Sequence, residues 1–148
     1  NDRLLGEAGN DSLTGAEGAD SLLGGEGAAY LTGGNGVARF GGGNGNDRFD
    51  FNRIEESGLG AARDIVQDFK QVEADKIDLA TLDANVGVAG DQAFAFRGTG
   101  ALTGAAQVRY LVSGGITIIQ ISNDADAAAE MEIQLTGALS LVAADLVL

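Results

Sequence analysis

Five consecutive nine-residue units occupy residues 6–50 and constrain the fold more than any other feature of the chain. They read GEAGNDSLT, GAEGADSLL, GGEGAAYLT, GGNGVARFG and GGNGNDRFD. A short, fixed period is typical of a chain that coils into equal layers, each packed on its neighbours. Each unit opens with glycine, which allows the backbone to bend tightly. The pattern therefore predicts a six-residue turn followed by a three-residue strand in every unit.

A large apolar residue fills the eighth position of each unit. These residues are Leu13, Leu22, Leu31, Phe40 and Phe49, and Leu4 holds the same place one unit earlier. Because strand side chains alternate between faces, this is the residue that a three-residue strand points inward. Two units then form one coil with a strand on either side, so residues eighteen positions apart become neighbours. The alternative, a flexible glycine-rich linker, would have no reason to keep this apolar position.

Acidic residues gather at the sixth position, at the end of the turns. They are Asp2, Asp11, Asp20 and Asp47. Calcium prefers six to eight oxygen ligands, which can mix carboxylates with backbone carbonyls, and two stacked turns offer both. The sequence therefore predicts Ca²⁺ sites between turns that lie eighteen residues apart.

Two units break the acidic pattern, because Ala29 and Ala38 stand at the sixth position. One edge of the stack then carries Asp11, Ala29 and Asp47, and Asp2 with Asp20 is the one fully acidic pair on the other edge. We expect fewer or weaker ions than the repeat count suggests, with affinities of about 10⁻⁴ to 10⁻³ M or weaker.

The repeat resembles the repeats-in-toxin (RTX) nonapeptide, GGxGxDx followed by an apolar residue, which forms a calcium-binding parallel β-roll. In that family the ligands are the sixth-position aspartate and carbonyls of the turn glycines. For the acidic turns, the resemblance implies the ligands Asp2, Gly6, Gly9, Asp11, Gly15, Gly18, Asp20, Gly42, Gly43, Gly45 and Asp47. For the two turns without aspartate, it implies Gly24, Gly25, Gly27, Gly33, Gly34 and Gly36.

Composition restricts the function. The chain has 22 acidic and 9 basic residues, a net charge of −13, and neither histidine nor cysteine. Without bound cations an acidic, glycine-rich roll repels itself, so we expect it to be loose at low calcium and to fold as calcium binds. The absence of histidine excludes a Ser-His-Asp triad, a Cys-His pair and an HExxH zinc site, so we expect no enzyme. We also expect no nucleic-acid binding and no membrane span.

After Phe51 the nine-residue period stops and ordinary strand signals begin. Short β-branched or aromatic runs are expected as strands at 64–69, 76–79, 92–96, 107–112, 116–122 and 131–135. Ser113, Gly114 and Gly115 predict a hairpin turn between two of them. The expected fold is all-β, with a parallel β-roll over residues 1–51 and an antiparallel, sandwich-like β domain over residues 52–148.

The segment ESGLGAARDIVQDFKQVEADKIDL resembles the one that follows the repeats in the C-terminal domain of serralysin-type metalloproteases and other type I secreted proteins. The match rests on Glu56, Ser57, Asp64, Ile65, Asp68, Phe69, Asp75, Ile77, Asp78 and Leu79. In that family the acids after the last repeat complete a terminal calcium site, which implies Glu56, Asp64 and Asp75 here, unless these are solvated turn residues. Asn123, Asp124 and Asp126 are expected to form a turn.

Together these features predict a non-catalytic, calcium-dependent module from the C-terminus of a secreted, extracellular bacterial protein. Asn1 falls inside a repeat, so we expect a piece of a longer chain. The terminal DLVL resembles the ending of type I secretion substrates, although a packed last strand would look the same. The expected partners are the type I secretion machinery and an upstream domain. The alternative is an adhesive module that binds an acidic polysaccharide such as alginate through the outward residues Arg3, Leu5, Ser21, Leu23 and Arg39.

Overall fold

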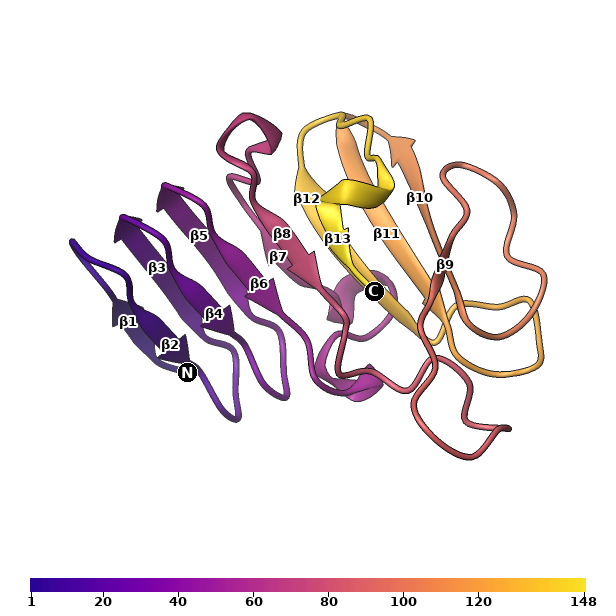
Figure 1. Ribbon diagram of the computed structural model, residues 1–148. Helices are drawn as coiled ribbons and strands as arrows, with labels where there is room; N and C mark the ends of the chain where they lie inside the picture. Colours follow the sequence, from indigo (N-terminus) through magenta and orange to yellow (C-terminus); the bar gives the residue numbers. More distant parts are fainter.

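A computed structural model describes all of residues 1–148 and shows two β-sheets that share one core (Figure 1). The eight-stranded sheet has the order β1-β3-β5-β7-β12-β11-β10-β9. Its strands are β1 (Arg3–Leu5), β3 (Ser21–Glu26), β5 (Arg39–Asn44), β7 (Asp64–Val66), β12 (Met131–Thr136), β11 (Ile116–Ser122), β10 (Gln107–Ser113) and β9 (Ala95–Phe96). The five-stranded sheet, in the order β13-β8-β6-β4-β2, consists of β13 (Leu146–Val147), β8 (Lys76–Asp78), β6 (Arg48–Asp50), β4 (Tyr30–Thr32) and β2 (Ser12–Thr14).

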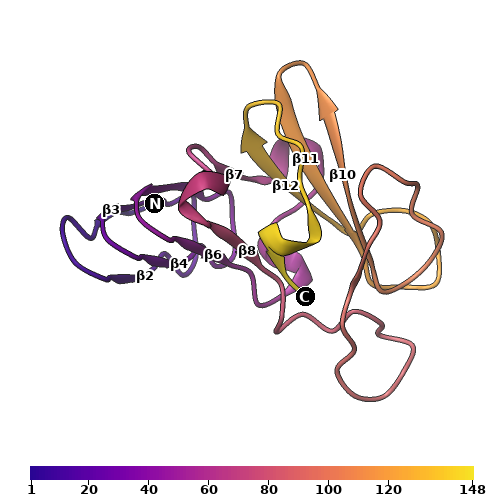
Figure 2. The same ribbon diagram turned by 45° about the horizontal axis from the view of Figure 1, so that its top comes forward.

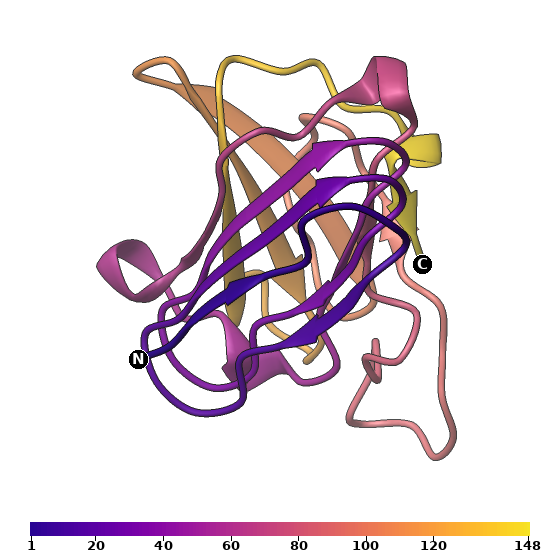
Figure 3. The same ribbon diagram turned by 90° about the vertical axis from the view of Figure 1, so that its left-hand side faces the viewer.

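The expected stacking of residues eighteen apart is confirmed among the parallel strands of both sheets. Leu4 pairs with Leu22 and Leu22 with Phe40 in one sheet, while Leu13 pairs with Leu31 and Leu31 with Phe49 in the other. Figure 3 looks along this stack and shows successive coils superposed. The apolar eighth-position residues therefore form a column through the middle of the roll.

The core of this column is aromatic at its C-terminal end. Phe40 is fully buried and meets Phe49 and Phe51 edge to face, with ring centroids 5.9 and 5.8 Å apart. The column runs without interruption into one cluster of 22 buried apolar residues, which includes Ile119, Ile133 and Leu135 of the C-terminal strands. The roll is thus packed against the rest of the chain by the same core that fills it.

The coil continues beyond the glycine repeats. β7 pairs in parallel with β5, and β8 pairs in parallel with β6, so residues 64–78 add one more coil after residue 51. Its two connections are longer than a glycine turn and contain the 3₁₀ helices η1 (Ile54–Glu56), η2 (Gly60–Ala62) and η3 (Gln71–Glu73). Residue 51 therefore marks the end of the nine-residue spacing, while parallel stacking persists through Asp78.

An antiparallel meander of β10, β11 and β12 follows at the end of the roll opposite β1 and β2 (Figure 2). The predicted hairpin is confirmed: Gly114 and Gly115, with φ of 60° and 81°, form the turn between β10 and β11. β12 pairs in parallel with β7, which joins the meander to the roll in a single sheet.

The last strand belongs to the five-stranded sheet. After the 3₁₀ helix η4 (Ala143–Asp145), β13 pairs in parallel with β8, and Leu146 is buried. None of the helices in the structure has the length and apolarity to cross a membrane.

Candidate metal centres

The turns of the roll stack into two edges. The first edge carries the turns 6–11, 24–29 and 42–47 and then the connection 67–75; the second carries 15–20 and 33–38 and then the connection 52–63. Backbone hydrogen bonds join successive turns, because the amides of Gly9 and Gly27 donate to the carbonyls of Glu26 and Asn44 at 2.8 Å. Each edge is therefore a ladder of backbone carbonyls and amides.

Glycine is needed in these turns because the coils approach so closely. A Cβ atom on Gly25, Gly34 or Gly43 would stand 2.0 Å from a carbonyl oxygen of the preceding coil, and these residues also have φ between 79° and 99°. The first two turns carry Glu7 and Ala16 at the corresponding position, with φ of 70° and 72°. Glu7 and Ala16 therefore adopt a left-handed conformation, which is unfavourable for residues that carry a side chain.

Aspartates tie each coil to the one before it through one carboxylate oxygen. The Oδ1 atoms of Asp20, Asp47 and Asp64 accept backbone N–H bonds from Asp2, Ala29 and Ala38, at 2.6 to 2.9 Å. The second oxygen has no partner: Oδ2 is buried without a hydrogen bond in Asp11, Asp20, Asp47 and Asp64. A buried carboxylate oxygen without a donor is costly, so these oxygens are suited to bind a cation.

Two of the unpartnered oxygens converge with a carbonyl from the next coil. The point that a Cβ of Gly6 would occupy lies 2.7 Å from Asp11 Oδ2 and 2.4 Å from the Gly24 carbonyl oxygen. At Gly15 the same point lies 2.8 Å from Asp20 Oδ2 and 2.7 Å from the Gly33 carbonyl oxygen. Glycine leaves room beside each of these oxygen pairs, and a carboxylate oxygen with a backbone carbonyl is a ligand combination that fits a hard divalent cation such as Ca²⁺. We call these two places the Asp11 cradle and the Asp20 cradle.

On each edge, the turn that follows the cradle has alanine in place of the aspartate. The corresponding point at Gly24 lies 2.6 Å from the Ala29 methyl carbon, and the point at Gly33 lies 2.8 Å from the Ala38 methyl carbon. The Asp11 and Asp20 amides, which would meet the missing carboxylates, donate no hydrogen bond. A methyl group thus replaces a ligand oxygen at one place on each edge.

Burial alters the acidity of the deepest carboxyl groups. Desolvation raises the pKa of Asp64 to about 8, against the lowering effect of its bond from the Ala38 amide, and the nearby Glu56 charge raises it further. Desolvation likewise raises the pKa of Asp75 to about 6 and raises that of Asp47. A bound cation would favour the ionised form of each group.

Glu56, Asp64 and Asp75 do not form the single terminal site that the family resemblance implied. Asp64 closes the second edge, with Glu56 near it, whereas Asp75 closes the first edge by accepting the Asp47 amide at 3.0 Å. The reason is that the coil continues through β7 and β8, so Asp75 falls on the edge opposite to Glu56 and Asp64. Glu56 is buried, and its Oε2 accepts a hydrogen bond from the Asn52 amide at 2.9 Å.

The two closing aspartates also differ in their free oxygens. Asp64 Oδ2 has no partner, while Asp75 Oδ2 accepts the Lys70 amide at 2.8 Å, so both Asp75 oxygens are hydrogen-bonded. Asp2, at the start of the second edge, is exposed and contributes its amide to Asp20. Of the predicted aspartate ligands, four therefore present a buried unpartnered oxygen: Asp11, Asp20, Asp47 and Asp64.

Sequence reasoning missed the side chains that close the last glycine turn. Asp68 accepts the Gly42 and Gly43 amides at 2.8 and 2.9 Å, and Glu73 accepts the Gly45 amide at 2.9 Å. Asp68 was part of the quoted family pattern, but the separations of 25 to 28 residues lie outside the period of eighteen that ordered the earlier turns.

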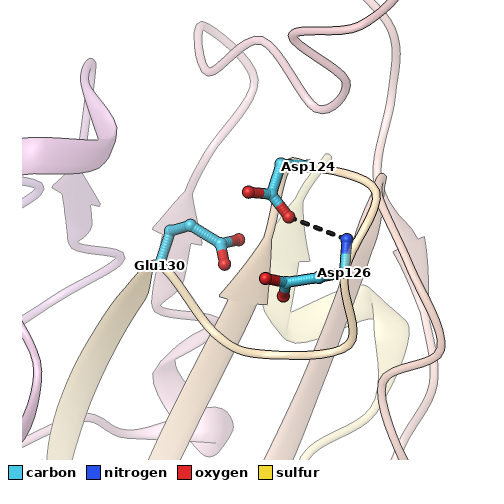
Figure 4. A group of neighbouring side chains, drawn as sticks. All are labelled: Asp124, Asp126 and Glu130. Atoms are coloured by element: carbon cyan, nitrogen blue, oxygen red, sulfur yellow. Dashed lines mark hydrogen bonds between the residues drawn. The ribbon is translucent and has the colours of Figure 1, made fainter.

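A third group of acids lies in the loop between β11 and β12. Carboxylate oxygens of Asp124, Asp126 and Glu130 approach within 4.8 Å of one another (Figure 4). Backbone amides occupy some of them, because Asp126 N–H donates to Asp124, Ala128 N–H to Asp126, and Asn123 N–H to Glu130. Hydrogen bonds from backbone amides to its own acidic side chains stabilise this loop as a turn.

The stacked turns with carboxylates between them define a β-roll module of the calcium-binding RTX type. The family described as Peptidase M10 serralysin C terminal matches residues 3–148, and the chain belongs to this family.

Two solved structures are similar over nearly the whole chain. The AlgE6R3 subunit of a mannuronan C5-epimerase from Azotobacter vinelandii is 28% identical, with a TM-score of 0.65, over 99% of this chain and 77% of that one. The AlgE6R2 subunit of the same enzyme is 27% identical, with a TM-score of 0.60, over 97% of this chain and 89% of that one. No curated protein sequence matches the chain. The all-β fold with a parallel roll is therefore confirmed.

Proposed function

We propose that this chain is a non-catalytic module of a secreted bacterial protein, and that calcium folds it after export through a type I machinery. The observation that carries the proposal is the set of buried, unpartnered Oδ2 atoms of Asp11, Asp20, Asp47 and Asp64 between stacked turns. In the folded roll without cations, burial removes these oxygens from water, and no hydrogen bond or ion pair compensates for the lost hydration. Calcium supplies the missing positive charge and the missing ligand contacts.

We assign the tightest binding to the Asp11 and Asp20 cradles, where a carboxylate oxygen and a carbonyl already converge. The predicted glycine ligands of the two turns that contain Ala29 and Ala38 contribute backbone carbonyls to weaker calcium sites. Asp75 is not assigned as a ligand, because neither of its oxygens is free.

The net charge of −13 and the glycine-rich turns favour a loose roll at low calcium, a state that can be threaded through an export channel. Millimolar calcium outside the cell then folds the roll, which stabilises the domain that precedes it. The C-terminal strand supports this order of events, since Leu146 is buried and β13 is paired in the folded state. A secretion signal at this end would be accessible only before folding.

The test is a calcium titration of the chelator-treated protein, followed by far-ultraviolet circular dichroism, with magnesium as the ion control. We expect a cooperative gain of β signal between about 10⁻⁴ and 10⁻³ M calcium and none with magnesium. Asp11→Ala combined with Asp20→Ala should move the midpoint at least tenfold upward, whereas Glu17→Ala, an exposed acid of the same turn, should not move it. A folded spectrum that ignores calcium would refute the proposal.

A second candidate function is binding of an acidic polysaccharide on the outer face of β1, β3 and β5. Arg3 and Arg39 lie in one row on either side of Ser21, and neither forms an ion pair in this acidic chain. Leu5 and Leu23 lie beside them in the next row. The similar AlgE6 subunits come from a mannuronan C5-epimerase, which makes a polymannuronate the natural first ligand to test.

That test is a calorimetric titration with polymannuronate oligomers in saturating calcium, with a neutral glucan as the ligand control. Arg3→Gln with Arg39→Gln should abolish binding. Arg97→Gln, which removes one positive charge outside this face, should leave binding unchanged, whereas Arg3→Gln or Arg39→Gln alone, with the same change in charge, should weaken it. Equal weakening by Arg97→Gln and by these single changes would point to a general charge effect and not to a site.

A further inference from the structure

The tetrapeptide Gly-Gly-Asn-Gly occurs twice in the roll, at residues 33–36 and 42–45, and these are the two places in the chain where glycine follows asparagine. Asparagine in this position can react with its own backbone. The amide nitrogen of the next residue attacks the side-chain carbonyl carbon, and glycine has no Cβ atom to hinder that approach. Because the two tetrapeptides are identical, the contacts that the fold makes around Asn35 and around Asn44 decide how each of them reacts.

Hydrogen bonds hold both reacting groups at Asn44. Its Nδ2 donates to Glu26 Oε1 at 2.9 Å, its Oδ1 accepts from Lys70 Nζ at 2.9 Å, and the Gly45 amide donates to Glu73 Oε2 at 2.9 Å. The side chains of Lys70 and Glu73 thus cap this turn. Attack would require the Asn44 amide group to rotate out of both contacts, and the Gly45 nitrogen to lose its proton beside a carboxylate, whose negative charge disfavours the anion. The fold therefore protects Asn44.

The identical pair of residues on the second edge has no such cap. Asn35 and Gly36 are both exposed, the Asn35 side chain makes no hydrogen bond, and the Gly36 amide has no acceptor within the chain. In the turn 33–38, Ala38 alone forms hydrogen bonds to the following coil. The Asn35 amide group is therefore free to rotate, and the Gly36 nitrogen can lose its proton to water.

One backbone contact remains at Asn35. Its carbonyl oxygen accepts the Gly18 amide at 2.9 Å, and this bond must open when the peptide between Asn35 and Gly36 rotates for the attack. Asn44 has the equivalent bond, from the Gly27 amide at 2.8 Å, in addition to the three described above. Opening one contact at an exposed position is a local event that needs less free energy than opening four.

We propose that Asn35 and Gly36 form a site of spontaneous deamidation in the folded protein, while the side chains around Asn44 protect the identical sequence there. The Gly36 nitrogen forms a bond to Asn35 Cγ, the bond between Cγ and Nδ2 breaks, and Nδ2 leaves as ammonia with the proton from Gly36. Water then opens the cyclic imide at one of its two carbon–nitrogen bonds. Cleavage at Cγ leaves aspartate at position 35, and cleavage at the main-chain carbon leaves isoaspartate. Water is the one co-reactant, and nothing is oxidised or reduced.

The isoaspartate product should weaken the neighbouring calcium site. It routes the main chain through Cγ, which adds a carbon atom before Gly36 and displaces the carbonyl group that accepts the Gly18 amide. The Asp20 cradle lies between the same two turns, since the Gly33 carbonyl oxygen is part of it. This consequence rests on the proposed calcium binding, whereas the deamidation site does not.

Peptide mapping by mass spectrometry, with chromatographic separation of the two products, tests the site in the whole 148-residue chain. During incubation at mildly alkaline pH in saturating calcium, Asn35 should deamidate about tenfold faster than Asn44. In denaturant the two rates should become similar, because the contacts are lost.

Two variants test the role of the contacts. Glu73→Ala frees the Gly45 amide and should speed deamidation of Asn44 in calcium while leaving Asn35 unchanged. Glu55→Ala is the matched control, since Glu55 is an exposed acid without a hydrogen bond, and it should change neither rate.

Equal rates at Asn35 and Asn44 in calcium would overturn the inference, and so would a difference that persists in denaturant. An Asn35 that stays intact in calcium after the denatured protein has reacted completely would also overturn it. Failure of the proposed function looks different: the contrast between the two asparagines would hold, but the purified isoaspartate form would have the same calcium midpoint as the unmodified protein. Asn35→Asp supplies the charge without the added carbon atom and should keep that midpoint.

Discussion

The first coils and the last coil of the roll face the same physical problem and meet it differently. In both, tight turns place carboxylates and backbone amides in a buried ladder. The first coils use glycine turns and leave Asp11 Oδ2 and Asp20 Oδ2 without a partner, whereas the last coil uses longer connections whose side chains satisfy most donors and acceptors. The difference shows that one stack can combine coils that leave a carboxylate oxygen unpartnered with a coil whose own side chains cap the neighbouring turn.

The strongest perturbation should act on both regions at once, because they share an apolar core. Phe40→Ala removes a fully buried ring that contacts Phe49 and Phe51, and we expect a loss of about 3–5 kcal/mol in unfolding free energy. The loss should be similar in saturating calcium and in chelator, since neither the Phe40 ring nor the Phe49 and Phe51 rings that it contacts supply a ligand oxygen. Denaturant unfolding in both conditions measures it.

Phe96→Ala is the comparison for that experiment, since Phe96 is half-buried and stacks on Tyr110 in the meander. It should cost less and leave the calcium midpoint unchanged. A Phe40→Ala effect confined to chelator would contradict a core common to both regions, because calcium would then be replacing core packing.

The pH dependence should have opposite signs with and without calcium. The folded pKa values of Asp64 and Asp75, raised to about 8 and about 6, mean that the calcium-free folded state binds more protons than the unfolded state, in which aspartate titrates near 4. Calcium-free stability should therefore fall as pH rises from about 4 to 8. Calcium competes with these protons at Asp64, so its apparent affinity should rise over the upper part of this window.

Thermal unfolding at several pH values, with chelator and with calcium, measures both trends. Asp64→Asn removes the group whose pKa is raised most and should flatten the calcium-free curve above pH 6. A calcium-free protein that becomes more stable as pH rises from 5 to 8 would contradict the burial of an uncompensated carboxyl group.

Restoring the missing carboxylate in the turn 24–29 should strengthen calcium binding there, as proposed for the turns that contain Asp11 and Asp20. Ala29→Asp puts an acid where a methyl now lies between the turns 24–29 and 42–47, and the new carboxylate can accept the idle Asp11 amide. We expect about tenfold tighter calcium binding on the first edge, close to 1.4 kcal/mol, and a lower melting temperature in chelator.

Calorimetric calcium titration measures that change, and Ala28→Asp is its control, since Ala28 is exposed in the same turn. If both substitutions tightened binding equally, added negative charge alone would explain the gain. If Ala29→Asp tightened binding and Ala28→Asp did not, the carboxylate at position 29 would be shown to complete a set of calcium ligands.

How far the sequence predicts the structure follows from what repeats. The apolar eighth position determined the register, and Leu22, Leu31, Phe40 and Phe49 are stacked as expected because a period of eighteen leaves one possible alignment. The last coil escaped prediction because η1, η2 and η3 lengthen its connections, so no fixed spacing points from Asp64 to Ala38 or from Asp75 to Asp47. The cap by Lys70 depends on a side chain reaching across that coil, and a one-dimensional pattern does not record such a contact.

The smallest expected effect on stability concerns the first two turns, in which the second glycine of the repeat is replaced. Ala16 has φ of 72° and is exposed, at the position where later turns have Gly25, Gly34 and Gly43. A left-handed conformation costs an alanine about 1–2 kcal/mol, while glycine adds up to about 1 kcal/mol of chain entropy to the unfolded state. Ala16→Gly should therefore stabilise the calcium-bound protein by about 0.5 kcal/mol, measured by denaturant unfolding. Ala19→Gly, at an exposed position of the same turn without positive φ, should instead destabilise it, because there glycine adds entropy and relieves nothing.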